Sequence, residues 1–251
     1  MNNNIIKTTI IDLISSKTYL ILLLLIICGS YVFTSYNPVT SNYITNINYT
    51  LTMHQNYYTF IVFPVIVFLT VNVYYRFSKN SMILLRVKNK KAYLKLQLKA
   101  NFFLITVLFI QILIAIMISI NLNRSVDFKI INDEYYNIPN IVVLLVNLFK
   151  VYMCFIVLQL IVLLSINLLN KQLSLFTVFI YIVLIRLSSK LQYTPVIGYL
   201  MPSSNIYSYI IYDNILQSFI TSFAYYLVEI TILIIILKKN IIKNSIEKEI
   251  L

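Results

Sequence analysis

The chain has 251 residues, of which 60 % are hydrophobic and only 11 % are charged, and its mean hydropathy is +0.84. A soluble domain carries about 25 % charged residues, so this composition excludes a soluble globule and predicts an integral membrane protein. The net charge of +12 does not indicate nucleic-acid binding, because the basic residues lie in the gaps between apolar runs, where the positive-inside rule expects them.

Residues 1–17 predict a short amphipathic helix. Their apolar side chains share one helical stripe, and Lys7, Asp12 and Ser16 fall away from it. This pattern is typical of a helix that lies in the membrane interface. The stripe consists of Ile5, Ile6, Ile10, Leu13 and Ile14.

Six apolar segments follow, each close to the ~20 residues that a helix needs to cross the hydrocarbon core. Irregular backbone cannot face lipid, and the runs are continuous rather than alternating, so they predict helices and not the strands of a barrel. The expected fold class is an all-α membrane protein with six transmembrane helices in a single domain, residues 1–251. Pro64, inside the second segment, predicts a kink there. The segments are Thr18–Tyr36, Tyr57–Tyr75, Asn101–Asn121, Asn140–Leu169, Leu173–Ser188 and Ile215–Leu237.

The distribution of Lys and Arg predicts the orientation. With the N-terminus in the cytoplasm, fifteen of the 20 basic residues lie on the cytoplasmic side and three on the opposite side. This bias predicts that both termini are cytoplasmic and that the uncharged stretch Asn37–Asn56 is an outer loop. Richness in Asn, Ile, Lys and Tyr is typical of an AT-rich bacterial genome, so we expect a multi-pass protein of the bacterial plasma membrane.

The basic stretch of residues 76–100 predicts a cytoplasmic loop that docks a partner protein. It contains eight Lys and Arg residues and no acidic residue, and a short apolar cluster lies inside it. Asn80 or Ser81 is a suitable N-cap for a short helix that carries this cluster. The residues expected to dock the partner are Asn80, Ser81, Met82, Leu84, Leu85, Arg86 and Val87.

Residues 189–214 predict an outer loop with a re-entrant element. The run from 194 to 202 is apolar but too short to span a membrane, and Pro195, Gly198 and Pro202 favour a turn within it. Such a run suits a re-entrant hairpin that dips into the outer leaflet and is shielded by protein. An ordinary apolar loop is the alternative.

Two charged residues lie well inside the apolar segments, Lys150 in the fourth and Glu229 in the sixth. A charge at mid-membrane costs about 2.5–3.5 kcal/mol on insertion scales, so pairing or contact with water is expected. Three interpretations stay open: a polar spot on a transport path, an interhelical ion pair, and outward snorkelling of Lys150.

The chain lacks the residues that most enzymes need. Gly29 and Gly198 are its only glycines, so a Gly-rich phosphate-binding loop is impossible. His54 is the only histidine, and Cys28 and Cys154 are isolated in apolar runs, which indicates neither a metal site nor a catalytic triad. We therefore expect no catalytic residue, metal or cofactor in this chain, and any energy source must come from a partner.

In its topology the chain resembles an ABC-2 type transporter permease. The likeness rests on the interfacial N-terminal helix, six spans, the basic loop after the second span and the re-entrant element before the last. It implies that Asn80–Val87 is the coupling helix, although Ser78-Lys79-Asn80 stands where many members carry a glutamate. It also implies a separate ATPase subunit that binds ATP and magnesium, and a second permease in a homo- or heterodimer. Within the family, the composition is most similar to exporters of phenol-soluble modulins, which implies amphipathic peptide or lipid-like cargo.

A different class of function fits the same features. A non-transporting immunity or scaffold protein would bind a toxic peptide, or recruit a partner, without an energy source. The basic loop would then only attract anionic lipid, at about 1 kcal/mol per basic residue near the surface. Co-purification of an ATP-binding subunit separates the two hypotheses.

Overall fold

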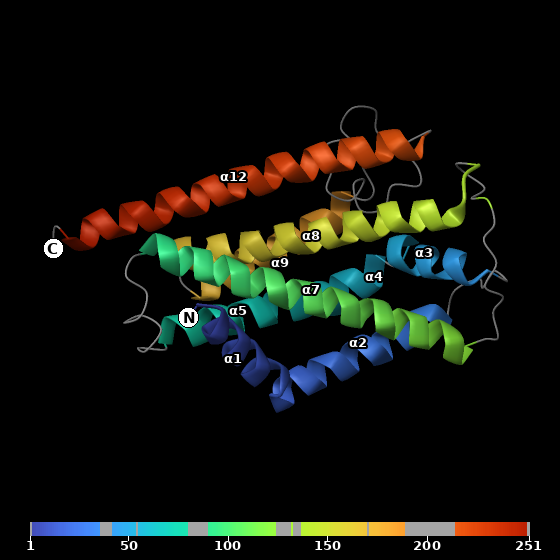
Figure 1. Cartoon of the computed structure of the whole chain (residues 1–251), viewed down its shortest axis with the longest axis horizontal. Helices are drawn as coiled ribbons and strands as arrows, with labels where there is room; N and C mark the ends of the chain where they lie inside the picture. Colours follow the sequence, from blue (N-terminus) through green and yellow to red (C-terminus); the bar gives the residue numbers. More distant parts are fainter. Residues whose placement is uncertain are drawn as a thin grey trace.

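The computed structural model describes residues 2–35, 42–53, 55–79, 90–123, 132, 137–169, 171–188 and 214–249. These residues are almost entirely helical and contain no β-strand; a single isolated bridge joins Asn132 and Pro139. Figure 1 shows long helices that run side by side along the molecule. The expected all-α fold is confirmed.

The helical elements of the described residues follow one another along the chain without any intervening sheet. In order, they are α1 (Asn2–Ile14), α2 (Lys17–Ser35), α3 (Tyr43–Met53), α4 (Gln55–Tyr57), the π-helical turn η1 (Tyr58–Val62), α5 (Phe63–Lys79), α7 (Lys90–Asn123), α8 (Asn140–Leu168), α9 (Lys171–Ser188) and α12 (Ile215–Glu249).

Five of the described helical segments are long and apolar enough to cross a membrane. They are Lys17–Ser35, Tyr58–Phe77, Ala92–Asn123, Asn140–Leu168 and Ile215–Asn240. Helix α9 falls short, because its apolar part is limited to Leu173–Arg186. A multi-pass membrane protein is therefore supported, and the sixth span stays a prediction.

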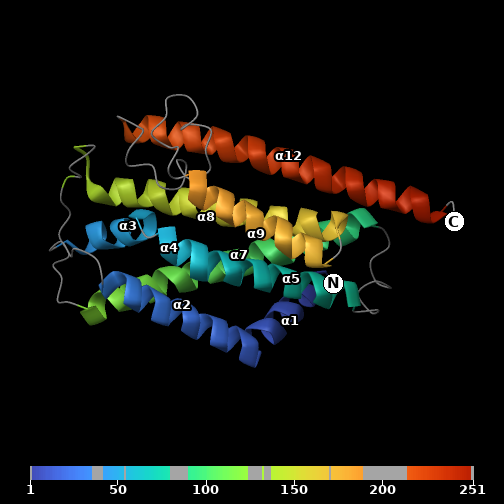
Figure 2. The same cartoon turned by 180° about the vertical axis from the view of Figure 1, so that it is seen from behind.

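Helix α8 lies at the centre of the bundle. It contacts α3, α5, α7, α9 and α12, and both views place it between α12 on one side and α7 on the other (Figure 1 and Figure 2). Its buried Phe155 packs among the rings of Tyr58, Phe63 and Phe109, with centroids 6.1, 6.4 and 5.9 Å away. Aromatic packing on several sides makes α8 the core helix.

Polar contacts join α2 to α7. The hydroxyls of Ser30 and Ser119 are 2.7 Å apart, and Asn123 Nδ2 donates to Thr34 Oγ1 over 2.8 Å. Lipid is as apolar as the side chains that it touches, so hydrogen bonds and small residues carry much of the specificity between membrane helices. These contacts fix how α2 and α7 lie against each other.

The irregularity predicted at Pro64 takes the form of the π-helical turn η1. The amide N–H of Phe63 donates to the carbonyl of Tyr58, five residues earlier. Proline has no N–H to donate to the carbonyl of the preceding turn, and a π-turn is one of the ways in which a helix accommodates it.

Gly29 of α2 faces this turn at close range. A Cβ at Gly29 would collide with the Ile61 side chain and lie 3.2 Å from the ring of Tyr57. The Tyr57 hydroxyl donates to the carbonyl of Ile26 over 3.2 Å. Glycine therefore lets α2 approach closely enough for this hydrogen bond.

The stretch Asn37–Asn56, predicted as an outer loop, contains helix α3, which was not predicted; its position outside the membrane stays a prediction. The side chain of Asn42 caps this helix: its Oδ1 accepts from the amide N–H of Thr45 over 3.1 Å. Its apolar residues recur at helical spacing and are buried against α7 and α8. They are Tyr43, Ile44, Ile47 and Leu51.

Tyr43 ties the start of α3 to α7. Its hydroxyl donates to the carbonyl of Met117 and accepts from Asn121 Nδ2, each over 3.3 Å. Burial raises the pKa of this hydroxyl above its ordinary value, and the hydrogen bond from Asn121 partly opposes the shift. Tyr43 therefore stays protonated and remains a donor at neutral pH.

The predicted loop of residues 76–100 is mostly helical. Helix α5 continues to Lys79 and α7 begins at Lys90, so the second half of the basic stretch belongs to the helix that contains the third span. Only residues 80–89 separate the two helices, and they lie outside the described residues.

The N-terminal segment forms a helix, as predicted. Ile10 and Leu13 of α1 are buried, and α1 contacts α5 and α7. The chain bends after α1, and the Ser16 hydroxyl accepts from the N–H of Tyr19 (3.2 Å) and donates to the carbonyl of Leu13 (2.6 Å). That α1 lies in the membrane interface stays a prediction.

Candidate functional site: a polar column along helix α8

A line of polar side chains is buried along the N-terminal half of α8. Asn140, Asn147 and Lys150 are only 1 %, 2 % and 0 % exposed. Spacings of three and seven residues place all three on one face of the helix. We call them, together with their partners Asn42, Thr45, Asn48 and Ser218, the polar column.

Helix α3 supplies the first group of partners. Asn140 Nδ2 donates to Asn42 Oδ1 and to Thr45 Oγ1, each over 3.0 Å. One turn into α3, Asn48 Oδ1 accepts from Asn147 Nδ2 over 2.6 Å. Asn42 and Asn48 are buried as well. Directional hydrogen bonds between buried amides therefore fasten α3 to α8.

Helix α12 supplies a partner for the buried Lys150. Lys150 Nζ donates to Ser218 Oγ, and neither residue is exposed. Lys150 lies ten residues after the first residue of α8, about 15 Å along the helix axis. Helical side chains point back toward the N-terminus, and this direction brings the lysine to the first turn of α12.

Aromatic rings lie beside this bridge. The ring of Phe149 packs 5.2 Å from that of Phe219 and 6.0 Å from that of Phe223, between centroids. Ser222, one turn after Ser218, is fully buried too. The α8–α12 contact thus has a polar strip next to an apolar one.

The structure does not bring Lys150 and Glu229 together. Ser218, which Lys150 contacts, precedes Glu229 by eleven residues on α12, or about 16 Å. Glu229 Oε1 instead accepts from the Tyr181 hydroxyl of α9 over 3.3 Å. The interpretation as an ion pair is therefore not supported, because the lysine extends toward the N-terminal end of α12.

A second polar cluster joins α7 to α8. Gln159 Nε2 donates to the carbonyl oxygen and to Oδ1 of Asn101, over 2.8 and 3.2 Å. The amide of the neighbouring Gln97 is buried and has no hydrogen-bond partner among the described residues. Sequence reasoning missed both polar groups, because it looked only for charges; amide side chains inside apolar runs were the available signal.

Several predicted residues lie outside the described part of the chain. These are the docking residues at 80–87, the hairpin residues Pro195, Gly198 and Pro202, and His54. In the part that is described, no group of three or more His, Cys, Asp or Glu side chains is placed to hold a metal ion. The polar column itself offers a lysine amine and amides, which can hold anionic or hydrogen-bonding groups.

Comparison with known proteins adds no relative to this picture. No family model, no curated protein and no solved structure matches this chain.

Proposed function

We propose that this chain is the permease subunit of an ATP-driven exporter of the ABC-2 type, and that it moves amphipathic peptides or lipid-like molecules out of the cell. The observation that carries the proposal is the polar column, a buried ammonium group with amide neighbours in helices that are apolar enough to cross a membrane. Ionisable groups within membrane segments are costly and often mark transport paths.

The pattern of the α8–α12 contact supports an amphipathic cargo. Separation of the two helices would uncover Lys150 and Ser218 next to the rings of Phe149, Phe219 and Phe223. An amphipathic peptide helix has the same combination of a polar and an apolar face. A hydrated ion would instead need a ring of polar groups to replace its water shell.

Helix α12 lies on the outer side of the bundle (Figure 1), which supports its role in such a movement. Its contacts are mainly with α8 and secondarily with α7, and most of its large apolar side chains are exposed, among them Leu216, Ile220 and Leu227. Lipid or a second permease would cover this face. Movement of α12 away from α8 would have to separate the most extensive helix–helix contact of the described residues.

The proposed docking segment is connected to the core at both ends. Residues 80–89 join α5 to α7, and both of these helices contact α8. An ATPase subunit that moves this segment would thus act on the helices around the polar column. In this proposal the partner binds and hydrolyses ATP with magnesium, and this chain contributes no catalytic group.

Co-purification from native membranes tests the proposal. The wild-type protein should bring an ATP-binding subunit with it, and Leu85→Asp and Arg86→Glu should each lose that subunit. Lys95→Glu is the matched control, since Lys95 is an exposed basic residue in the first turns of α7 and should retain the partner. Retained ATPase subunit in both docking variants would refute the docking assignment.

A non-transporting immunity or scaffold protein is the second candidate. The hydrogen bond between Asn147 and Asn48 favours it, because amide pairs of this kind also serve as static contacts between membrane helices. If no ATP-binding subunit accompanies the wild-type protein, and Lys150→Met still protects cells against an amphipathic toxin, this second function is the correct one.

A further inference from the structure

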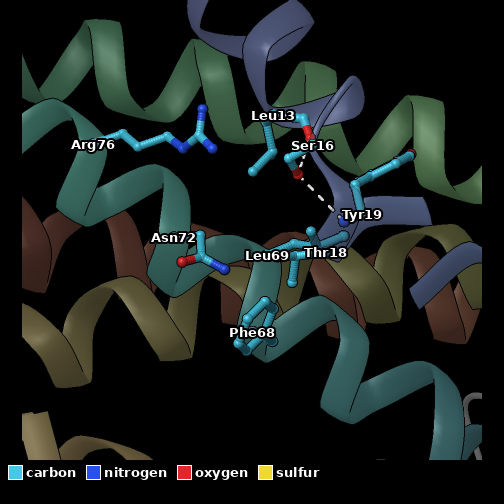
Figure 3. A pocket seen from close by; sticks show the side chains of 8 residues that line it. All are labelled: Leu13, Ser16, Thr18, Tyr19, Phe68, Leu69, Asn72 and Arg76. Atoms are coloured by element: carbon cyan, nitrogen blue, oxygen red, sulfur yellow. Dashed lines mark hydrogen bonds between the residues drawn. The ribbon is translucent and has the colours of Figure 1, made fainter. Parts of the chain in front are cut away.

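A pocket lies between the bend that joins α1 to α2 and one face of α5. It is a small, partly open pocket with a cavity volume of about 80 Å³. Figure 3 shows Arg76 and Asn72 reaching from α5 toward Leu13 and Thr18 at the bend, with Phe68 and Leu69 further along α5. The pocket is separate from the polar column, and the proposed transport function does not use it.

Two hydrogen-bond donors of α5 converge on this pocket. Asn72 and Arg76 are four residues apart, so they share one face of the helix. Neither side chain has a hydrogen bond or an ion pair with any residue in the described part of the chain. Asp12, an acidic residue close by in α1, does not pair with the guanidinium either. The guanidinium and the amide are therefore available to a ligand.

The depth of the pocket in the membrane follows from the spans. Lys17 begins one apolar span, and Phe77 ends another. Arg76 therefore lies at a boundary of the hydrocarbon region, where lipid phosphates lie. Phe68 lies eight residues earlier on α5, or about 12 Å further into the apolar region. The pocket thus changes from cationic to apolar with increasing depth.

We propose that this pocket binds the phosphate group of an anionic phospholipid. The planar fork of Arg76 matches two phosphate oxygens, and the Asn72 amide donates to a third or to the glycerol ester. An acyl chain lies along Phe68 and Leu69. Lys17, exposed at the start of α2, adds positive charge near the mouth, which favours anionic over zwitterionic headgroups.

The test is lipid retention by the purified full-length protein, measured by native mass spectrometry after incubation with phosphatidylglycerol or phosphatidylcholine. The wild-type protein should retain phosphatidylglycerol preferentially. Arg76→Gln should lower that retention roughly tenfold, the value of one charge-assisted hydrogen bond. Lys99→Gln is the matched control: Lys99 is exposed on α7, does not line the pocket, and should bind as the wild type does.

A second variant at Arg76 and a competition measurement complete the test. Arg76→Lys keeps the charge but not the fork, so it should retain phosphatidylglycerol at an intermediate level even if Arg76→Gln folds poorly. Glycerol phosphate, which has the headgroup but no acyl chain, should not displace the lipid. Wild-type retention by Arg76→Gln would overturn the site, and displacement by glycerol phosphate would show a binding site for soluble anions instead of lipid.

Discussion

Two of the helices that contact α8, α3 and α12, are held against it by different kinds of interaction. Toward α3 it is held by hydrogen bonds between buried amides, Asn140 with Asn42 and Asn147 with Asn48. Toward α12 it is held by the hydrogen bond from Lys150 to Ser218, by phenyl rings, and by the buried leucines Leu160, Leu163 and Leu237. Helix α3 has most of its described side chains buried, whereas α12 leaves a long apolar face exposed.

The difference shows which part of the bundle can move. Amide pairs require one register, and a shift of one residue breaks them. Phenyl rings exchange a protein neighbour for a lipid chain at little cost, because both are apolar. The α3–α8 contact therefore depends on an exact register, whereas the α8–α12 contact is more extensive but depends mainly on apolar packing. We infer that the α8–α12 contact is the one that opens in the proposed function.

The largest expected effect comes from locking the α8–α12 contact. Phe149→Cys with Phe219→Cys, in a background with Cys28 and Cys154 replaced by Ala, can be joined by a flexible, reducible thiol cross-linker. We expect complete loss of ATPase stimulation by an amphipathic helical peptide in vesicles that contain the ATPase subunit. Reduction of the cross-link should restore it, and undiminished stimulation in the cross-linked protein would show that this contact stays closed.

Replacement of the buried charge should separate stability from function. Lys150→Met removes an ammonium group whose insertion costs about 2.5–3.5 kcal/mol, and so should raise the thermal unfolding temperature while peptide stimulation is lost. Lys95→Met, at an exposed position of α7, should change neither the unfolding temperature nor the stimulation by peptide. A variant that is less stable than the wild type, yet fully stimulated, would assign Lys150 a purely structural role.

The amide pair of the α3–α8 contact should contribute a smaller amount. Asn147→Leu leaves the buried Oδ1 of Asn48 without this donor, at a cost of about 1–2 kcal/mol in unfolding free energy. The double variant Asn48→Leu/Asn147→Leu should recover part of the loss, since neither amide is then left without its partner. Equal losses in the single and double variants, measured by thermal unfolding in detergent, would mean that the two residues are not coupled.

The smallest change in stability is expected for a ring of α12 that packs against α8. Phe223→Leu removes one stacked ring, and lipid takes its place. The unfolding free energy should therefore fall by less than about 0.5 kcal/mol, which is below the usual value of an aromatic pair in water. The same measurement on Phe155→Leu, a ring buried in the core of the bundle, provides the contrast. A loss at Phe223 as large as that at Phe155 would contradict a weakly held α12.

Hydrophobicity alone predicted most of the architecture. The segment predicted at Asn140–Leu169 is α8, Asn140–Leu168, and the segment predicted to start at Ile215 does so. Long apolar runs leave the backbone no alternative to a helix in lipid. The end of α12 differs, because a helix continues past the apolar run when its polar residues are also good helix formers.

Two features required information that apolar runs do not contain. Helix α3 was missed because Asn and Thr alternate with its apolar residues, although Asn42 was a readable N-cap. The contact of Lys150 with Ser218 was missed because only the charged Glu229 was considered as a partner within the apolar segments. The direction of the side chain, back toward the helix N-terminus, decides in favour of Ser218.

Helix α7 has a mechanical consequence. It runs unbroken for 34 residues, about 51 Å, whereas the hydrocarbon core measures only ~30 Å. A helix of that length extends past the hydrocarbon core, and its far end is tied to α2 by the Asn123–Thr34 hydrogen bond. A displacement of α7 at Lys90 would therefore be transmitted to α2 as well.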